Sequence, residues 1–187
     1  MPPCRGVRSF LRMKLRHPVL ALATLAVTTL GMVTTAGAAA PEREVPSVFS
    51  IAKSSNKNQV HYAIELDDAC APIGANPVRP YWRMLERSPD ATEPLLDREQ
   101  RAYGIARQDV SGSQVRVVLR ALPARPITIR TAHAADGTCS ATATVGIGSA
   151  SARLHDIYVK QSLFGVDYLL LTGWADSGAV VREKLSL

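Results

Sequence analysis

The first 38 residues of this 187-residue chain contain no aspartate and no glutamate. The whole chain has 22 basic and 16 acidic residues and a formal charge of +6, an excess typical of nucleic-acid-binding proteins. Five of the cations lie in the acid-free segment: Arg5, Arg8, Arg12, Lys14 and Arg16. The rest of the chain therefore holds 17 basic residues against 16 acidic ones, and this balance removes the argument for nucleic-acid binding.

The acid-free segment has the order of parts typical of a secretory signal peptide. Its cations precede an apolar stretch, Val19–Val33, and the small residues Ala36–Ala38 follow, so we predict cleavage after Ala38. The translation start, Met1 or Met13, stays open. About fifteen apolar residues at about 1.5 Å each reach about 23 Å, short of the roughly 30 Å hydrocarbon core. We therefore predict no transmembrane anchor after processing, an exported (periplasmic or secreted) protein, and one domain over residues 39–187.

Cysteine is scarce, with three residues in the chain. Cys4 lies in the predicted signal, and Cys70 and Cys139 remain as an even pair. In an oxidising compartment such a pair is expected to form a disulfide. The alternative, a metal site, needs further ligands at useful spacing, and the histidines and carboxylates are scattered. We predict the disulfide, no metal site and no cofactor.

Common catalytic signatures are also absent from the sequence. It contains no G-x-S-x-G, no H-E-x-x-H and no phosphate-binding P-loop. The predicted mature chain has three widely separated histidines, His61, His133 and His155. These absences favour a non-catalytic protein and assign no catalytic residue, but they leave open an active site assembled from distant parts of the chain.

Alternation of apolar and polar residues predicts strands over most of the mature chain. It is clearest in Val60–Leu66, which we pair with Val48–Ala52 across a polar turn. Further strands are expected at Tyr81–Glu86, Gln114–Leu122, Ile127–Thr131, Cys139–Ile147, Leu154–Lys160, Val166–Thr172 and Val180–Leu185. Thr92–Ala102 begins with a capping residue and has proline in its first turn, which predicts a short helix. The chain is thus expected to be mainly β: an antiparallel β-sandwich or barrel of about eight to nine strands with one short helix.

Five runs occur in order along the chain: Lys53–Tyr62, Pro80–Glu86, Thr92–Leu95, Ala102–Ile105 and Gly165–Tyr168. In these runs the sequence resembles the bacterial "domain of unknown function 4833" family, whose members typically carry an export signal. The resemblance covers about Val45 to Leu185 and implies a single exported domain. The family has no established reaction, cofactor or catalytic residue, so the resemblance implies no function.

Polar and aromatic residues in or near these runs form a candidate ligand site. They are Asn56, Asn58, His61, Tyr81, Trp82, Arg83, Tyr103 and Asp167. Tyr81 and Arg83 share one strand face, so together these side chains can line a cleft for a small polar or anionic ligand. The alternative is structural: the asparagines satisfy turn backbone groups, Trp82 lies in the core, and Arg83 pairs with Asp167 or Glu65.

Three functions are compatible with these observations. The favoured one is a non-catalytic binding or interaction module of unknown ligand. The second is an enzyme whose active site contains His61, Tyr81, Arg83 and Asp167. The third is a structural cell-envelope protein that docks on a partner protein through an exposed strand edge.

Overall fold

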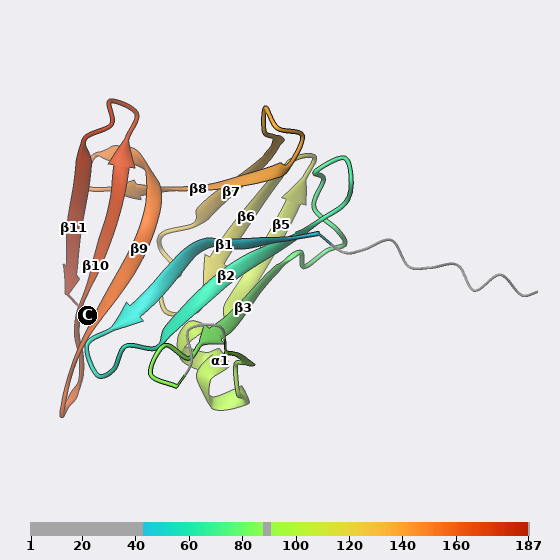
Figure 1. Cartoon of the computed structure of the whole chain (residues 1–187). Coiled ribbons are helices and arrows are strands. Elements are labelled where there is room, and N and C mark those ends of the chain that lie inside the picture. The colour runs from blue at the N-terminus through green and yellow to red at the C-terminus, as the bar shows by residue number, and fades with distance from the viewer. Residues whose placement is uncertain (1–42, 88–90, 187) are drawn as a thin grey trace, which may run out of the picture. The chain divides into compact units, whose positions relative to one another are not determined.

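The structure, a computed structural model, describes residues 43–87 and 91–186, with side chains from residue 47 onward. The predicted signal peptide lies outside the described residues. Within them, eleven strands and one helix form the domain (Figure 1). They are β1 (Arg43–Lys53), β2 (Gln59–Leu66), β3 (Val78–Arg83), β4 (Thr92–Pro94), α1 (Asp97–Tyr103), β5 (Ile105–Ser111), β6 (Gln114–Leu119), β7 (Ile127–His133), β8 (Cys139–Ile147), β9 (Ala150–Ser162), β10 (Gly165–Ala175) and β11 (Val180–Ser186).

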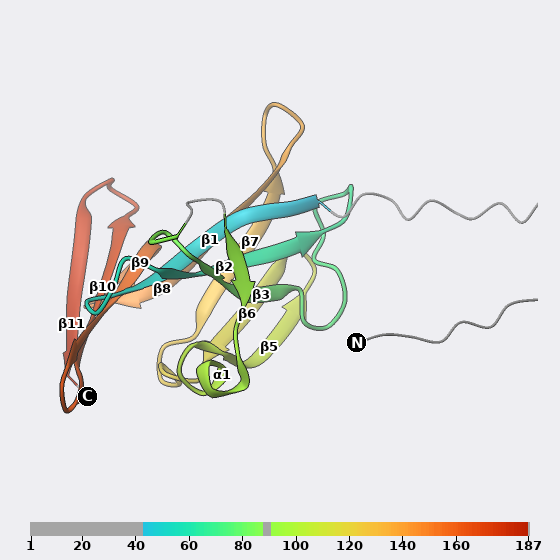
Figure 2. The ribbon, with the colours of Figure 1, turned by 60° about the horizontal axis from the view of Figure 1, so that its bottom comes forward.

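The strands form one open sheet that forks at β9. One edge of β9 pairs with β8 through Ala150–Arg153 and, further along, in parallel with β1 through residues 156–159. The strands on these two sides form two layers. The first layer consists of β1, β2, β3 and β4, and the second layer consists of β8, β7, β6 and β5. The opposite edge of β9 pairs with β10, which pairs with β11, and Figures 1 and 2 show these three strands beside the two layers.

A β-bulge at His155 marks the fork. Leu154 pairs with Gly173 and Asp156 pairs with Thr172, so His155 is an extra residue in β9. A bulge bends its strand and increases the local twist, which separates the neighbours on either side of it. At this bulge the backbones of β9 and β10 lie unusually close together. Gly173 of β10 permits this, because a Cβ on it would lie 2.5 Å from the Arg153 carbonyl oxygen of β9.

The hydrophobic core lies between the layers and against β9 and β10. The inward residues of β2 alternate as in a regular strand, and Val60, Tyr62 and Ile64 are all fully buried. In β9 the buried positions are Ala152 and Leu154 before the bulge but Ile157 and Val159 after it. The extra residue thus shifts the alternation by one, which keeps both halves of β9 facing the core.

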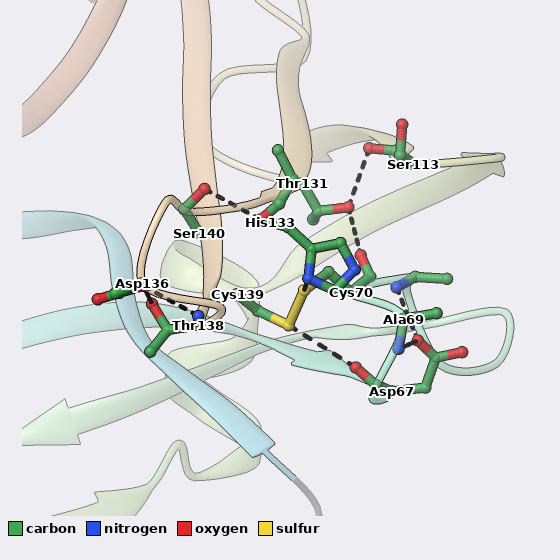
Figure 3. Close-up of a disulfide and its surroundings, with 12 residues drawn as sticks. Asp67, Ala69, Cys70, Ser113, Thr131, His133, Asp136, Thr138, Cys139 and Ser140 are labelled. Carbon is green, nitrogen blue, oxygen red and sulfur yellow. Dashed lines mark hydrogen bonds between the residues drawn. A yellow bond between two sulfur atoms is a disulfide. The ribbon is translucent and has the colours of Figure 1, made fainter.

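Covalent and polar links also join the layers away from β9. The predicted disulfide between Cys70 and Cys139 is confirmed, with a Cα–Cα distance of 5.3 Å (Figure 3). Thr131 donates its hydroxyl to the Cys70 carbonyl at 2.7 Å. The Gln108 side-chain amide bonds both the N–H and the carbonyl of Val78, each at 2.9 Å. These links connect the loop after β2 and the strand β3 to the second layer.

The prediction of a mainly β domain with one short helix is confirmed, with differences in detail. The sheet is open, has eleven strands and contains one parallel pair, β1 with β9. The prediction of a helix from Thr92 was wrong, because Thr92–Pro94 pairs with Tyr81–Arg83 as β4 and α1 begins only at Asp97. Strand β5 was not predicted, because this edge strand is mostly exposed and lacks apolar alternation.

Candidate functional site

A cleft of about 520 Å³ lies where the two layers diverge from β9. Strands β1, β2, β8, β9 and β10 all contribute to its lining. Its main polar and aromatic side chains are Ser47, Ser50, Gln59, His61, Thr142, Arg153, His155, Asp156 and Trp174. Ser50 of β1 pairs with both His61 and Asp156, so a single cross-strand row joins the two walls of this fork cleft.

The wall formed by β9 and β10 carries charge next to an indole ring. The Arg153 guanidinium lies over the Trp174 ring, 5.0 Å from its centroid. The His155 ring meets Trp174 edge to face at 4.8 Å, and its Nδ1 lies 2.7 Å from Asp156 Oδ1. Cation–π and edge-to-face contacts of this kind hold Arg153 and the His155 ring against the indole.

The wall formed by β1 and β2 contains a hydrogen-bonded chain of three side chains. Ser47 lies in a second bulge, where residues 46–48 of β1 face Ala63 alone, and it has a positive φ of 44°. Its Oγ lies 2.6 Å from His61 Nδ1, and His61 Nε2 lies 3.1 Å from Gln59 Oε1. A non-glycine residue with positive φ is strained, and such strain is concentrated at functional sites.

The surroundings of His61 favour its neutral form. The residue is only 7% exposed, and burial, assisted by the positive charge of Arg83, lowers the pKa of the imidazole below its usual value. The contact with Gln59 Oε1, an oxygen that can only accept, suits the tautomer with the proton on Nε2. In that tautomer Nδ1 is a hydrogen-bond acceptor 2.6 Å from Ser47 Oγ, whose hydroxyl also donates to the Phe49 carbonyl at 3.3 Å.

Two side chains of opposite charge line the fork cleft. Arg153 is the one side chain with a permanent positive charge among the lining residues, and Asp156 is the one carboxylate among them. Asp156 contacts the His155 ring, and Arg153 contacts the Trp174 ring, so the guanidinium is not paired with the carboxylate. Guanidinium groups bind carboxylates and phosphates through charge-assisted, often bidentate hydrogen bonds.

The family membership of this chain rests on a match that covers most of its residues. The family model described as "Domain of unknown function (DUF4833)" matches residues 49–184. The chain belongs to this family. No curated protein and no solved structure matches it. The match includes His61, Arg153 and Trp174, whereas Ser47 lies just before it.

Three of the sequence-predicted site residues lie together in this DUF4833 domain. The rings of His61 and Tyr81 are stacked, with centroids 5.8 Å apart. Arg83 is opposite Gln59 in the register of β2 and β3, close enough to His61 for its charge to act on the imidazole. Of the three, only His61 lines the fork cleft, and the Tyr81 ring of β3 stacks on the His61 ring.

The asparagines and Tyr103 have structural contacts instead. Asn56 Oδ1 accepts from the Asn58 backbone N–H at 3.1 Å, and Asn58 Oδ1 accepts from the Glu86 N–H at 3.2 Å. The Tyr103 ring packs edge to face on Trp82 at 5.4 Å. The asparagines thus organise the β1–β2 turn, and Tyr103 packs against the core.

Asp167 lies apart from the other predicted site residues. It is exposed and forms a one-residue bulge in β10, between the pairs Val166–Gln161 and Tyr168–Lys160. Thr172, which pairs with Asp156 at the cleft, is five residues further along β10, about 16 Å at the usual rise per residue. The grouping of Asp167 with His61 therefore needs correction, and Glu65, the other predicted partner of Arg83, binds Arg79.

Sequence reasoning missed Ser47, Arg153, His155 and Trp174. Ser47 and His155 are located by bulges, which alternation alone does not reveal, and Arg153 lies two residues before the bulge at His155. A residue pattern that changes phase within one strand, as in β9, is the signal that could have found this site.

Among the described residues there is no cluster of three potential metal ligands. The one helix in that part of the chain is too short to cross a bilayer.

Proposed function

We propose that this DUF4833 protein is exported and binds a small polar ligand carrying a carboxylate or phosphate group in the fork cleft. Export is supported by the signal-like order of residues 1–38 and by the disulfide, which is typical of oxidising compartments. The binding role is supported by the cleft itself. Its volume of about 520 Å³ falls in the usual range for small-molecule sites.

The observation that carries the proposal is the position of Arg153. Its guanidinium lies on the Trp174 ring, which restricts it without neutralising its charge. In the described part of the chain no carboxylate is within ion-pair distance of it. A ligand can thus place an anionic group on Arg153, and the hydroxyl and amide groups of Ser50, Thr142 and Gln59 offer further hydrogen bonds.

The proposal is tested by thermal denaturation of the oxidised protein with a panel of small anions. The panel contains inorganic phosphate, sugar phosphates, uronic acids, amino acids and di- and tricarboxylates. Any compound that raises the melting temperature is tested again on Arg153→Ala and on Arg116→Ala, an exposed arginine on β6 outside the cleft. We expect the stabilisation to disappear in Arg153→Ala and to persist in Arg116→Ala; equal responses in both variants contradict the proposal.

A second candidate function, acyl transfer with Ser47 as nucleophile, is favoured by one observation. Ser47 Oγ lies 2.6 Å from His61 Nδ1 and 3.3 Å from the Phe49 carbonyl oxygen, so a neutral His61 with its proton on Nε2 can compete for the hydroxyl hydrogen, and transfer of that hydrogen to Nδ1 would activate the serine. In this reaction Ser47 Oγ attacks the carbonyl carbon of an ester while its proton passes to His61 Nδ1 and then to the leaving alcohol. Water, deprotonated by His61, then hydrolyses the acyl-enzyme.

This candidate is separated from simple binding by covalent labelling. A fluorophosphonate reagent should label the wild-type protein on Ser47 and leave Ser47→Ala unlabelled, as mapped by mass spectrometry. Absence of labelling in a protein that still binds small anions supports the binding module and rejects the hydrolase.

A further inference from the structure

The most exposed apolar side chains of the domain lie at the tip of the β9–β10 hairpin. Leu163 and Phe164 are each 99% exposed, whereas the other exposed large apolar residues in the described part of the chain range from 39% to 53%. They form the two-residue connection between Ser162 and Gly165, which face each other across the hairpin. The tip is at the end of β9 away from the fork cleft, since the cleft residues Arg153–Asp156 lie in the first half of that strand.

Leucine and phenylalanine are unusual residues for a two-residue hairpin turn. Central positions of two-residue hairpin connections favour Gly, Asn and Asp, because those residues adopt the required backbone angles and are easily solvated. Full exposure of a leucine and a phenylalanine has an unfavourable free energy of hydration, which burial elsewhere would remove. Nothing within the described chain covers them, so their apolar surface is available to something outside the domain.

The residues behind the tip have the order found at membrane interfaces. Lys160 and Tyr168 face each other in the hairpin, and the Lys184 Nζ of β11 lies 4.2 Å from the Tyr168 ring centroid. Because of the bulge at Asp167, Tyr168 lies only two pairs behind the Ser162–Gly165 pair, about 7 Å at the rise of a strand. If the tip enters the headgroup–acyl boundary by about 5–10 Å, Tyr168 and the two lysines lie at headgroup level. Tyrosine and lysine are favoured there, and lysine is attracted to anionic lipid.

We propose that the Leu163–Phe164 tip inserts into the surface of an anionic phospholipid bilayer. A membrane suits the tip better than a protein surface does. Two apolar side chains on a narrow hairpin offer far less than the roughly 800 Å² per partner of a stable protein–protein interface. Shallow insertion needs only a small apolar point with a net positive charge behind it, and Lys160 and Lys184 together outweigh the exposed Asp167 of the same hairpin. The inference does not depend on what the fork cleft binds.

The test is co-sedimentation with lipid vesicles. The full chain is expressed, and its processed form is purified after mass spectrometry has shown loss of the apolar leader. Vesicles contain either phosphatidylcholine alone or phosphatidylcholine with about one third phosphatidylglycerol. We compare the wild type with Leu163→Ser/Phe164→Ser and with the control Val110→Ser/Val180→Ser, which removes two exposed apolar residues elsewhere.

We expect the wild type and the control to bind the anionic vesicles, and the tip variant to bind at least tenfold more weakly. Lys160→Gln/Lys184→Gln should lose the preference for anionic over neutral vesicles, and high salt should have the same effect. Phe164→Trp should bind like the wild type and show a blue shift of its emission on binding. The proposal is overturned if the wild type does not sediment with anionic vesicles, or if the tip variant sediments as well as the control. The result expected for a protein-docking tip is no binding to any vesicle.

Discussion

Replacement of Gly173 by alanine tests the origin of the fork most sharply. Gly173 lies in β10 opposite Leu154, next to the bulge that separates the two layers. An added Cβ would lie 2.5 Å from the Arg153 carbonyl oxygen and 2.9 Å from Ile147 Cδ1. Ordinary van der Waals contact begins near 3.4 Å, so the β9 backbone must move by about 0.9 Å at Arg153.

Because the closest atom belongs to the backbone of a paired strand, the clash cannot be relieved by rotation of a side chain. Overpacking of this kind costs about 1–3 kcal/mol, and we expect Gly173→Ala to fall in the upper half of that range. For a domain of this size the melting temperature should fall by roughly 4–10 °C. The shift should also displace Arg153 from Trp174 and weaken anion binding in the cleft.

Gly146→Ala is the matched control. Gly146 lies in β8 of the same sheet, and the nearest atom to an added Cβ is Arg125 Nη1 at 3.7 Å, an ordinary contact. This substitution should be neutral or stabilise the fold by about 0.5 kcal/mol through a smaller loss of backbone entropy. Differential scanning calorimetry of the two variants decides the matter: equal melting temperatures for both would refute the close-approach argument.

Three further predictions concern stability. Because burial and Arg83 lower the pKa of His61, the unfolded chain binds a proton at a higher pH than the folded chain does, so the free energy of unfolding should fall as the pH decreases below about 6.5. In urea unfolding measured over a range of pH, His61→Gln should reduce this decline. The same pH profile in the variant and the wild type contradicts the prediction. Removing the disulfide with Cys70→Ala/Cys139→Ala opens a 69-residue separation and should lower the free energy of unfolding by roughly 4 kcal/mol on the chain-entropy model, measured by guanidinium unfolding; a loss below about 1 kcal/mol would argue against that origin. Tyr62→Phe removes the hydrogen bond to the Tyr103 carbonyl and should lower stability by about 1–3 kcal/mol in the same assay, whereas Tyr158→Phe, on a half-buried tyrosine of β9, should change it little.

Much of the architecture could be predicted from local patterns. The β1–β2 hairpin follows from clear alternation in Val60–Leu66, because a strand with one buried face has a period of two. The disulfide follows from an even cysteine pair. The strand at Thr92–Pro94 could not be predicted, since its three exposed residues become a strand only through pairing with β3. The fork could not be predicted either, since it depends on strands that are far apart in the sequence.

In the candidate site too, some residues could be predicted from the sequence and others could not. His61, Tyr81 and Arg83 were grouped from their chemistry and from the shared strand face of Tyr81 and Arg83, and the register of β2 and β3 places His61 opposite Tyr81. Ser47 and His155 were missed because each lies in a bulge, where a strand departs from the alternation on which sequence reasoning relies. Asp167 was grouped with the others from its chemistry alone, and the register of β10 places it about five residues from the cleft.

The most direct test of the central claim is the dissociation constant of the most stabilising small anion, measured by isothermal titration calorimetry. Loss of a charge-assisted hydrogen bond is worth about 1.5–3 kcal/mol, or roughly 10- to 100-fold in affinity. The fork cleft predicts a Kd at least tenfold weaker in Arg153→Ala and within twofold of the wild type in Arg116→Ala. A Kd that is the same in Arg153→Ala and in the wild-type protein would contradict it.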